Sequence, residues 1–588
     1  MPLHQFDYLL AIGTIFAGLD AWNIGANDVA NSWATSVAAQ SITYLQAMVL
    51  GSVMEFAGAV GVGARVADTI RTKIVDTTLF NENPAMLMLG MVCAVTASAL
   101  CLTLATRLGM PVSTTHSIMG GVIGMGVAAV GADGVQWISK EGGALNSGVT
   151  QVFLAWIIAP GLAGAFGAII FLITKYTVMI RSNPALWALR VIPFYFALTA
   201  TLICMLLLWK GGGYKITLTD AEIAGTIVGV GVGFGLLVSI TLVPWMYRVV
   251  IKGDWQLRWW HIPLGLLLLR RPDAPPPPEG IAPVIKDYYE GRLTKEELEA
   301  RRAAERNDVE ATAATSSGSE PDKITKAEAS ASVDSAEDNS AGTTSPLANV
   351  TGPPRKSLVG PKPDGKWYES QVLFWYFKWA LLRGVDQDIN AHNSDSKLSG
   401  NIEEMHAHAT HYDNRAEYAY SFLQVMTAAT ASFTHGANDI ANAVGPFATV
   451  FQIWNEGIVP EKSHVPTWTL VFCAGMLVIG VWTYGYNVMR NLGNRLTLQS
   501  PSRGFSMELG SAITVILATR LKLPISTTQC KLGATVGVGL CSGTWRTVNW
   551  RMVAWIYFGW FITLPVAGII SGGLMGIIIN APRWGYSV

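Results

Sequence analysis

Gly25-Ala26-Asn27-Asp28-Val29-Ala30-Asn31 returns later in the chain as Gly436-Ala437-Asn438-Asp439-Ile440-Ala441-Asn442. Each copy lies inside an apolar stretch long enough to cross a bilayer, which takes about 20 residues. An ionisable side chain at that depth is costly, and such residues usually mark the path of a substrate or an ion. Asp28 and Asp439 therefore predict a membrane protein that moves a polar solute.

A second duplicated segment follows each copy of the heptapeptide. It reads Leu104-Ala-Thr-Arg-Leu-Gly-Met-Pro-Val-Ser-Thr-Thr115 in the first half and Leu517-Ala-Thr-Arg-Leu-Lys-Leu-Pro-Ile-Ser-Thr-Thr528 in the second. The heptapeptides are 411 residues apart and these segments 413, so a whole bundle of helices is duplicated. Polar segments that interrupt helices at matching places in two halves indicate the binding site of a transporter.

Composition supports a membrane protein and argues against several other classes. Of the 588 residues, 51% are hydrophobic and 14% are charged, whereas soluble domains carry about 25% charged residues. The net charge is zero, so nothing suggests a nucleic-acid partner. The six cysteines lack the spacing of zinc sites or disulfides. Since the apolar segments contain no nucleophile–base pair or metal-ligand cluster, we expect neither an enzyme nor a resident cofactor.

Hydropathy predicts an all-α polytopic membrane protein with about twelve transmembrane segments. The predicted segments are 8–37, 43–63, 86–106, 111–130, 147–175, 188–209, 221–250, 417–450, 467–490, 506–521, 524–543 and 552–579. Segment 8–37 is too long for one crossing, so we expect a broken helix or a hairpin with the heptapeptide at its middle. The same break is expected in 417–450, because irregular backbone at that depth is tolerated where it lines a cavity. Pro111 is expected at the first position of its helix.

The middle of the chain differs in character from both ends. Residues 251–271, rich in Trp, Arg and Leu, and the aromatic segment Trp367–Leu382 are expected at the membrane surface. A short helix is expected over Thr294–Ala304. The Ser/Ala/Thr/Glu-rich stretch that follows, to about Pro354, predicts a disordered linker. The histidines of this part, expected in solvent and not on a metal, are His406, His408 and His411.

These segments divide the chain into three parts. We expect an N-terminal membrane half over residues 1–250 with about seven spans, a loop over 251–415, and a C-terminal membrane half over 416–588 with about five spans. Because seven is odd, the two heptapeptides would enter from opposite faces, which gives two inverted repeats with broken or re-entrant helices at the midplane. Basic residues beside the loop place it in the cytoplasm and both termini outside.

The two Pro-(Val/Ile)-Ser-Thr-Thr segments are suited to an oxyanion. Each would open a helix, where free backbone N–H groups and the positive end of the dipole favour a negative charge. The hydroxyls that would line this site are Ser113, Thr114, Thr115, Ser526, Thr527 and Thr528. Ordinary helix capping by Ser and Thr is the structural alternative.

The heptapeptides supply oxygen ligands for a cation, namely those of Asn27, Asp28, Asn31, Asn438, Asp439 and Asn442. Carboxylate, amide and carbonyl oxygens of interrupted helices bind Na⁺ in transporters. An Asp beside an oxyanion would repel it unless a cation lay between, so the pair of motifs predicts a symporter of cation and anion. Hydrogen bonding between helices by small polar residues is the alternative. Glu55 and Glu508, also in apolar segments, could be ion ligands, proton sites or structural partners of an arginine.

At these residues the chain resembles the inorganic phosphate transporter (PiT) family, and most of all the fungal phosphate-repressible sodium–phosphate symporters. The duplicated heptapeptide and the two Ser-Thr-Thr segments carry the resemblance, which covers about residues 1–250 and 415–580. Glu55 and Glu508 also fall where the family has functional acids. The resemblance implies sodium-coupled symport of inorganic phosphate into the cell across the plasma membrane.

The resemblance also implies which residues bind each ligand. The implied phosphate-binding residues are Asn27, Asp28, Ser113, Thr114, Thr115, Asn438, Asp439, Ser526, Thr527 and Thr528. The implied Na⁺ ligands are Asp28, Asn31, Glu55, Asp439, Asn442 and Glu508. Phosphate, Na⁺ and the lipid bilayer are the expected partners, and assembly into a homodimer is left open. Coupling to H⁺, transport of another oxyanion, and a phosphate receptor that does not transport are the open alternatives.

Overall fold

The computed structural model describes residues 2–64, 74–138, 148–210, 218–280, 283–316, 358–382, 384, 400–460, 465–520, 523 and 525–581. Within these ranges, the side chains of residues 30–31, 209–210, 308–316, 381, 490–491 and 519–520 are not described. Helices account for nearly all of the regular structure, and these residues form no β-strand beyond one isolated bridge between Val75 and Val135. The predicted all-α class is confirmed.

The helices of the first half are η1 (His4–Phe6), α1 (Asp7–Ile24), η2 (Gly25–Val29), α2 (Ala30–Ala38), α3 (Tyr44–Val62), η3 (Thr77–Phe80), α5 (Pro84–Arg107), α6 (Thr114–Val130), η4 (Ala132–Gly134), α7 (Val149–Thr174), η5 (Lys175–Met179), α8 (Pro184–Lys210), α9 (Asp220–Met246) and η6 (Tyr247–Ile251). The middle part contains η7 (Trp259–Arg270), α10 (Lys295–Ser316), α11 (Ser370–Leu382) and α12 (Ile402–Ala407). The second half contains α13 (Asn414–Glu456), α14 (Thr467–Leu496), α15 (Pro501–Arg520), α16 (Thr527–Cys541), η9 (Trp545–Thr547) and α17 (Trp550–Asn580).

Eight of the described helices are long and apolar enough to cross a membrane, by length and composition. This confirms a polytopic membrane protein, while the count of twelve spans stays a prediction. α6 and α16 have 17 and 15 residues and are too short to cross a bilayer fully on their own. Each follows a longer helix, α5 or α15, after a short connection, so each pair forms a helical hairpin with one short arm.

The two heptapeptides do not break their helices as predicted. The first copy forms the π-helical turn η2 between α1 and α2, so the helix widens but the chain does not reverse. The second copy lies within α13, which runs unbroken for 43 residues. A continuous helix satisfies its own backbone hydrogen bonds, which is the cheaper solution inside a membrane. Pro111 also precedes its helix, because α6 begins at Thr114 with Ser113 as its N-cap.

Equivalent helices of the two halves make equivalent contacts with the opposite half. α13 packs against α3, and its counterpart α1 packs against α14; in the same way α17 packs against α6, and α7 against α16. Glycines in the motifs allow these close approaches. A Cβ at Gly25 would lie 1.9 Å from the carbonyl oxygen of Leu477, and one at Gly436 would lie 2.3 Å from that of Glu55. Because the two glycines are equivalent in the repeats, Leu477 occupies the place in the second half that Glu55 has in the first.

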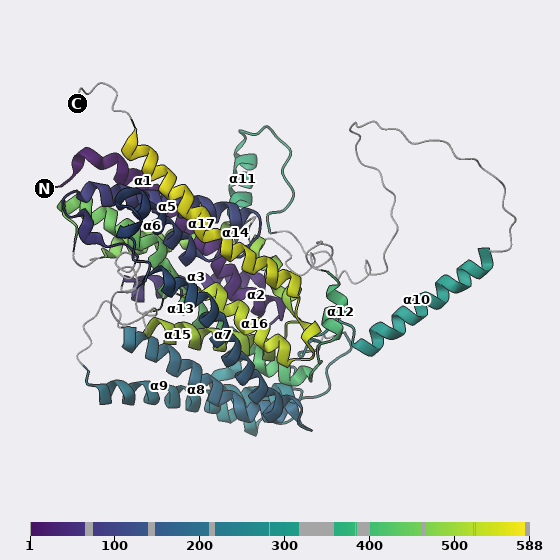
Figure 1. Cartoon of the computed structure of the whole chain (residues 1–588). Coiled ribbons are helices and arrows are strands. Elements are labelled where there is room, and N and C mark those ends of the chain that lie inside the picture. The colour runs from purple at the N-terminus through teal and green to yellow at the C-terminus, as the bar shows by residue number, and fades with distance from the viewer. Residues whose placement is uncertain are drawn as a thin grey trace, which may run out of the picture.

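α8 and α9 lie side by side along one edge of the bundle, and α10 projects away from it (Figure 1). α10 extends to Ser316, beyond the predicted end at Ala304. The linker expected to follow it lies largely outside the described residues. α11 forms where the segment Trp367–Leu382 was expected, and η7 packs against α9.

The expectation of solvent-exposed histidines is wrong for His406. Its side chain is buried, Nε2 donates to the carbonyl of Asn494 at 2.7 Å, and Nδ1 accepts from Arg292 at 3.0 Å. His411 stacks on Tyr289, with ring centroids 4.3 Å apart. The helix α12 therefore docks on the membrane domain through His406, a packing that the polar composition of this stretch concealed.

Candidate functional site

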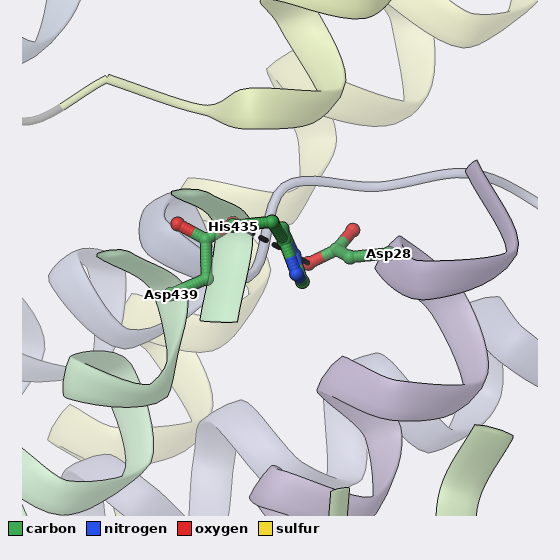
Figure 2. A group of neighbouring side chains, drawn as sticks. All are labelled: Asp28, His435 and Asp439. Carbon is green, nitrogen blue, oxygen red and sulfur yellow. Dashed lines mark ion pairs between the residues drawn. The ribbon is translucent and has the colours of Figure 1, made fainter. Parts of the chain in front are cut away.

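The two heptapeptides meet inside the bundle, where three ionisable side chains form one cluster. Asp28 lies in η2, and His435 and Asp439 lie one turn apart on α13; all three are buried. The ring of His435 lies between the two carboxylates (Figure 2). Its Nε2 is 3.0 Å from Asp439 Oδ2 and 3.8 Å from Asp28 Oδ2, within ion-pair range although neither contact is aligned as a hydrogen bond.

Glu55 on α3 joins this cluster through the other side of the ring. Its Oε2 lies 2.7 Å from His435 Nδ1, while its Oε1 has no hydrogen-bond partner among the described residues. A neutral imidazole can donate one hydrogen bond, whereas an imidazolium can donate two. His435 therefore links an acid of the first repeat to both motif aspartates, and its protonation sets the charge of the whole cluster.

Three threonine hydroxyls reach the two aspartates from the starts of α6 and α16. Thr114 donates to Asp28 Oδ2 at 2.9 Å, and its repeat counterpart Thr527 donates to Asp439 Oδ2 at 2.5 Å. Thr528 crosses between the halves and donates to Asp28 Oδ1 at 2.9 Å. The structure thus brings together the two kinds of motif that the sequence separates by about 85 residues in each half.

The first turns of α6 and α16 both begin at this cluster. Their unpaired backbone N–H groups and positive dipole ends favour an anion. Ser113 and Ser526 serve as N-caps, accepting from the backbone N–H groups of His116 at 3.3 Å and Gln529 at 3.4 Å. These two serines thus make the ordinary capping contact. Either hydroxyl retains a proton that it can still donate to a ligand.

The asparagines of the second heptapeptide also face the cluster. Asn442 Nδ2 donates to Thr114 Oγ1 at 3.1 Å and to Thr115 Oγ1 at 3.2 Å, and Asn438 Nδ2 donates to Asp439 Oδ1 at 2.7 Å. Asn442 therefore ties the second motif to the helix start of the first half. The equivalent side chain in the first motif, Asn31, lies outside the described residues.

Asn27 makes its hydrogen bonds to the end of α5 and to the connection that follows it. Its Nδ2 donates to Thr106 Oγ1 at 3.1 Å and to the Met110 carbonyl at 3.0 Å, and its Oδ1 accepts from Val112 N–H at 3.2 Å. Thr106 lies in the last turn of α5, and Met110 and Val112 lie in the connection between α5 and α6. Asn27 thus holds this connection against η2 and positions the start of α6, and these bonds occupy both ends of its amide.

Glu508 lies in a separate hydrogen-bonded group. Its carboxylate accepts from Thr35 and Ser36 on α2 at 2.7 Å each, and from Thr427 on α13 at 2.6 Å. It makes no ion pair with another described residue. The structure therefore brings Glu55, but not Glu508, into contact with the His435 cluster.

Two further residues, which the motifs did not single out, belong to the site. Lys531, on α16 and buried, donates to the Ser32 carbonyl at 2.7 Å. It lines a cavity of about 10 Å³, room for about one water molecule, together with Asp28, His435 and Thr528, among others. The sequence could have indicated both residues. Lys531 is a charged residue within a predicted span, four residues after Thr527 and so on the same helix face. His435 directly precedes the second heptapeptide.

The charges of the cluster define what it can hold. Fully ionised, Asp28, Asp439 and Glu55 would carry three negative charges between them, against at most one positive charge each on His435 and Lys531. Buried charge must be paired or neutralised. The oxygen-rich cluster therefore suits a cation, and two helix starts with hydroxyls suit an anion beside it.

Comparisons with known proteins give the family. A sequence model described as the phosphate transporter family matches residues 24–571. The chain is 70% identical to the phosphate-repressible phosphate permease pho-4 of Neurospora crassa, over 100% of both chains. It is 28% identical to sodium-dependent phosphate transporter 2 of Felis catus, over 98% of this chain and 99% of that protein.

The fold has a counterpart among solved structures. A structure described as the sodium-dependent phosphate transporter matches 98% of this chain and 100% of its own, with a TM-score of 0.61 at 24% identity. Membership of a transporter family also confirms that the chain is not an enzyme. The chain belongs to the phosphate transporter family.

Proposed function

We propose that this protein is a secondary active transporter that carries inorganic phosphate into the cell together with Na⁺. The observation that carries the proposal is the convergence of two helix starts with the buried acidic cluster. Thr114 and Thr527 open these helices and contact Asp28 and Asp439. The names of the relatives, a phosphate permease and a sodium-dependent phosphate transporter, support the choice of both ions.

Phosphate would bind at the starts of α6 and α16. Thr114, Thr115, Thr527 and Thr528 would supply hydroxyls, the backbone N–H groups would supply further donors, and Lys531 would supply a positive charge. A hydroxyl has one proton and cannot donate to a carboxylate and to phosphate at once. Phosphate binding would therefore require these hydroxyls to turn from the aspartates, which frees carboxylate oxygens for a cation.

Na⁺ would bind at the motif aspartates, with Asp28, Asp439 and Asn442 as oxygen ligands and Asn31 as the repeat counterpart of Asn442. Na⁺ lying between these carboxylates and phosphate would neutralise part of both charges, which lowers the cost of burying either ion. Glu55 would act on this site through His435. Glu508, predicted as a further Na⁺ ligand, would instead hold α2 against α13 through its hydroxyl partners.

A second candidate, coupling to H⁺, is favoured by His435. The ring contacts Glu55 and both motif aspartates, so a protonated His435 would place a positive charge where the proposed Na⁺ binds. A protein that moves phosphate with H⁺ alone would be driven by a pH gradient, whereas the favoured function requires a Na⁺ gradient.

Location and assembly complete the proposal. The protein would lie in the plasma membrane, with the middle part 251–415 in the cytoplasm between membrane halves 1–250 and 416–588, and with both termini outside. In intact cells a cysteine introduced at Gln5 should react with impermeant reagents, and one introduced at Ser332 should not. Assembly into a homodimer stays a prediction, which native mass spectrometry of the purified protein tests.

The test of function is phosphate flux into proteoliposomes that contain the purified full-length chain. Uptake of labelled phosphate is expected when Na⁺ is outside and to fall to the level of empty liposomes when choline replaces it. Equal uptake driven by a pH gradient without Na⁺ would favour H⁺ coupling. Binding of phosphate without flux under either gradient would identify a receptor.

A further inference from the structure

α1 carries a second buried acid, Asp20, that takes no part in the contacts of the His435 cluster. Its side chain is fully buried, and neither carboxylate oxygen accepts a hydrogen bond from any described residue. The described Lys, Arg and His side chains form no ion pair with it. An unpaired carboxylate inside a membrane protein is costly, and such a group usually marks an ion path. Asp20 therefore requires a partner that is not one of these side chains.

Asn23, one turn further along α1, presents an oxygen that also has no partner. Its Nδ2 is held by three acceptors: the Leu19 carbonyl at 2.9 Å, the Ala99 carbonyl at 3.2 Å and Thr103 Oγ1 at 2.9 Å. These bonds fix which end of the amide is nitrogen. Asn23 Oδ1 is buried and unpartnered, and it lies on the side of α1 that carries Asp20.

Ser98 on α5 supplies a third unpartnered group. Its side chain is fully buried and its hydroxyl lies close to the Asp20 carboxylate, without reaching the geometry of a full hydrogen bond. Four oxygen atoms from Asp20, Asn23 and Ser98 are thus buried without a hydrogen-bond partner between two packed helices.

We propose that Asp20, Asn23 and Ser98 form a second cation site, which binds Na⁺. A hard cation prefers carboxylate, amide and hydroxyl oxygens, and one ion would satisfy all four atoms. A proton on Asp20 would satisfy only one donor–acceptor pair and leave the other oxygens without partners. A single carboxylate balances a single positive charge, so a monovalent ion fits better than a divalent one.

This site is separate from the one at the heptapeptides. Asp20 precedes Asp28 by roughly two turns of the same helix, too far for one ion to contact both. With the offset of 411 residues between the heptapeptides, the counterpart of Asp20 in the second half is Ala431. The site therefore belongs to the first half alone, and the duplication of the motifs could not reveal it. Its use in transport rests on the proposed Na⁺ coupling.

The test counts bound Na⁺ on the purified full-length protein in nanodiscs, by scintillation proximity with ²²Na⁺ at constant ionic strength and pH. Asp20→Asn is expected to bind one Na⁺ fewer per chain than wild type. Ser98→Ala, which keeps the charge, is expected to raise the Na⁺ concentration for half-saturation of this site by roughly tenfold. The matched controls on α1 are Asp7→Asn, at the exposed end of the helix, and Thr14→Val, whose hydroxyl already donates to Leu10.

An unchanged Na⁺ count in Asp20→Asn would overturn the proposal, because it would mean that the carboxyl is neutralised by a proton. If Asp20→Asn does not fold, wild-type Na⁺ affinity in Ser98→Ala would overturn it equally. Phosphate flux measured on the same wild-type preparation tests the proposed function separately. Absence of Na⁺-driven flux with an intact Na⁺ count would reject the transport function and keep the cation site.

Discussion

His435 Nδ1 lies 2.7 Å from Glu55 Oε2, so a histidine of the second repeat contacts a carboxylate of the first repeat. Neither residue has an equivalent in the other half, because Ile24 and Leu477 occupy the corresponding places. The contacts Thr114–Asp28 and Thr527–Asp439 are duplicated, whereas this contact, like that of Thr528 with Asp28, occurs once. The link between His435 and Glu55 therefore contributes to the asymmetry of the proposed Na⁺ site.

The first prediction concerns this link. His435→Gln keeps a hydrogen-bonding side chain but removes the titratable charge, so the dependence of phosphate uptake on pH should differ from that of wild type. Glu55→Gln should weaken Na⁺ dependence, and the double variant should be no worse than the poorer single one, since both act through one contact. The measurement is uptake titrated with Na⁺ at two pH values.

His116→Gln is the matched control for that experiment. His116 is also buried, but its partner is the indole of Trp156 at 2.7 Å, and its repeat counterpart is already Gln529. This variant should keep the wild-type pH profile. An equal change of the profile in His116→Gln and His435→Gln would contradict the role assigned to the link.

Lys531 should act on the anion. Lys531→Met keeps the length of the side chain and removes its charge, so the phosphate concentration for half-maximal uptake should rise by roughly ten- to a hundredfold. Lys531→Arg keeps the charge and should restore most of the affinity. A wild-type phosphate titration in the Met variant would exclude Lys531 from the phosphate site.

Glu508 should act on stability more than on Na⁺. Its carboxylate accepts from three hydroxyls, and hydrogen bonds to a charged group are worth about 1.5–3 kcal/mol each. Glu508→Gln should therefore lower the thermal unfolding temperature of the purified protein and leave its Na⁺ half-saturation unchanged. A shift in Na⁺ half-saturation without loss of stability would instead make Glu508 an ion ligand, as the sequence predicts.

Docking of α12 should depend on pH. Burial, followed by the nearby Arg292 charge, lowers the pKa of His406 from about 6.5 to about 3. The undocked segment takes up a proton below about 6.5 and the docked one does not, so docking weakens as pH falls from 6.5 toward 3, by up to ~1.4 kcal/mol per pH unit.

Hydrogen exchange of residues 402–412, corrected for its intrinsic pH dependence, measures this effect. Protection should fall between pH 7.5 and pH 5.5 in wild type. His406→Gln cannot take up this proton, so its protection should fall by less than that of wild type. Protection in wild type that does not change with pH would contradict the assigned contact.

The duplicated motifs predict the contacts that are themselves duplicated. Two copies at matching offsets are enough to place Thr114 near Asp28 and Thr527 near Asp439, since only a shared site explains two such polar pairs in apolar segments. Helix bounds follow from hydropathy, as in α3 and α5.

The contacts that occur once could not be predicted in this way. His435, Lys531 and Asp20 have the apolar counterparts Ile24, Ile118 and Ala431, so comparing the repeats hides them. Their partners lie hundreds of residues away or on a neighbouring helix, and only packing brings them together. The prediction that the heptapeptides break their helices was wrong for a related reason. The polar side chains of the motifs form hydrogen bonds with neighbouring helices, so the helices that carry them can stay continuous.

The central claim is that the aspartates hold Na⁺ while the threonines hold phosphate. Uptake titrated against both ions, in well-expressed Asp28→Asn, Asp439→Asn, Thr114→Val and Thr527→Val, tests it most directly. The Asp variants should need more Na⁺, and the Thr variants should need roughly ten- to a hundredfold more phosphate. Because coupling is reciprocal, the larger effect identifies the ligand. Wild-type titrations in all four variants, or a defect for phosphate alone in the Asp variants, would contradict the account.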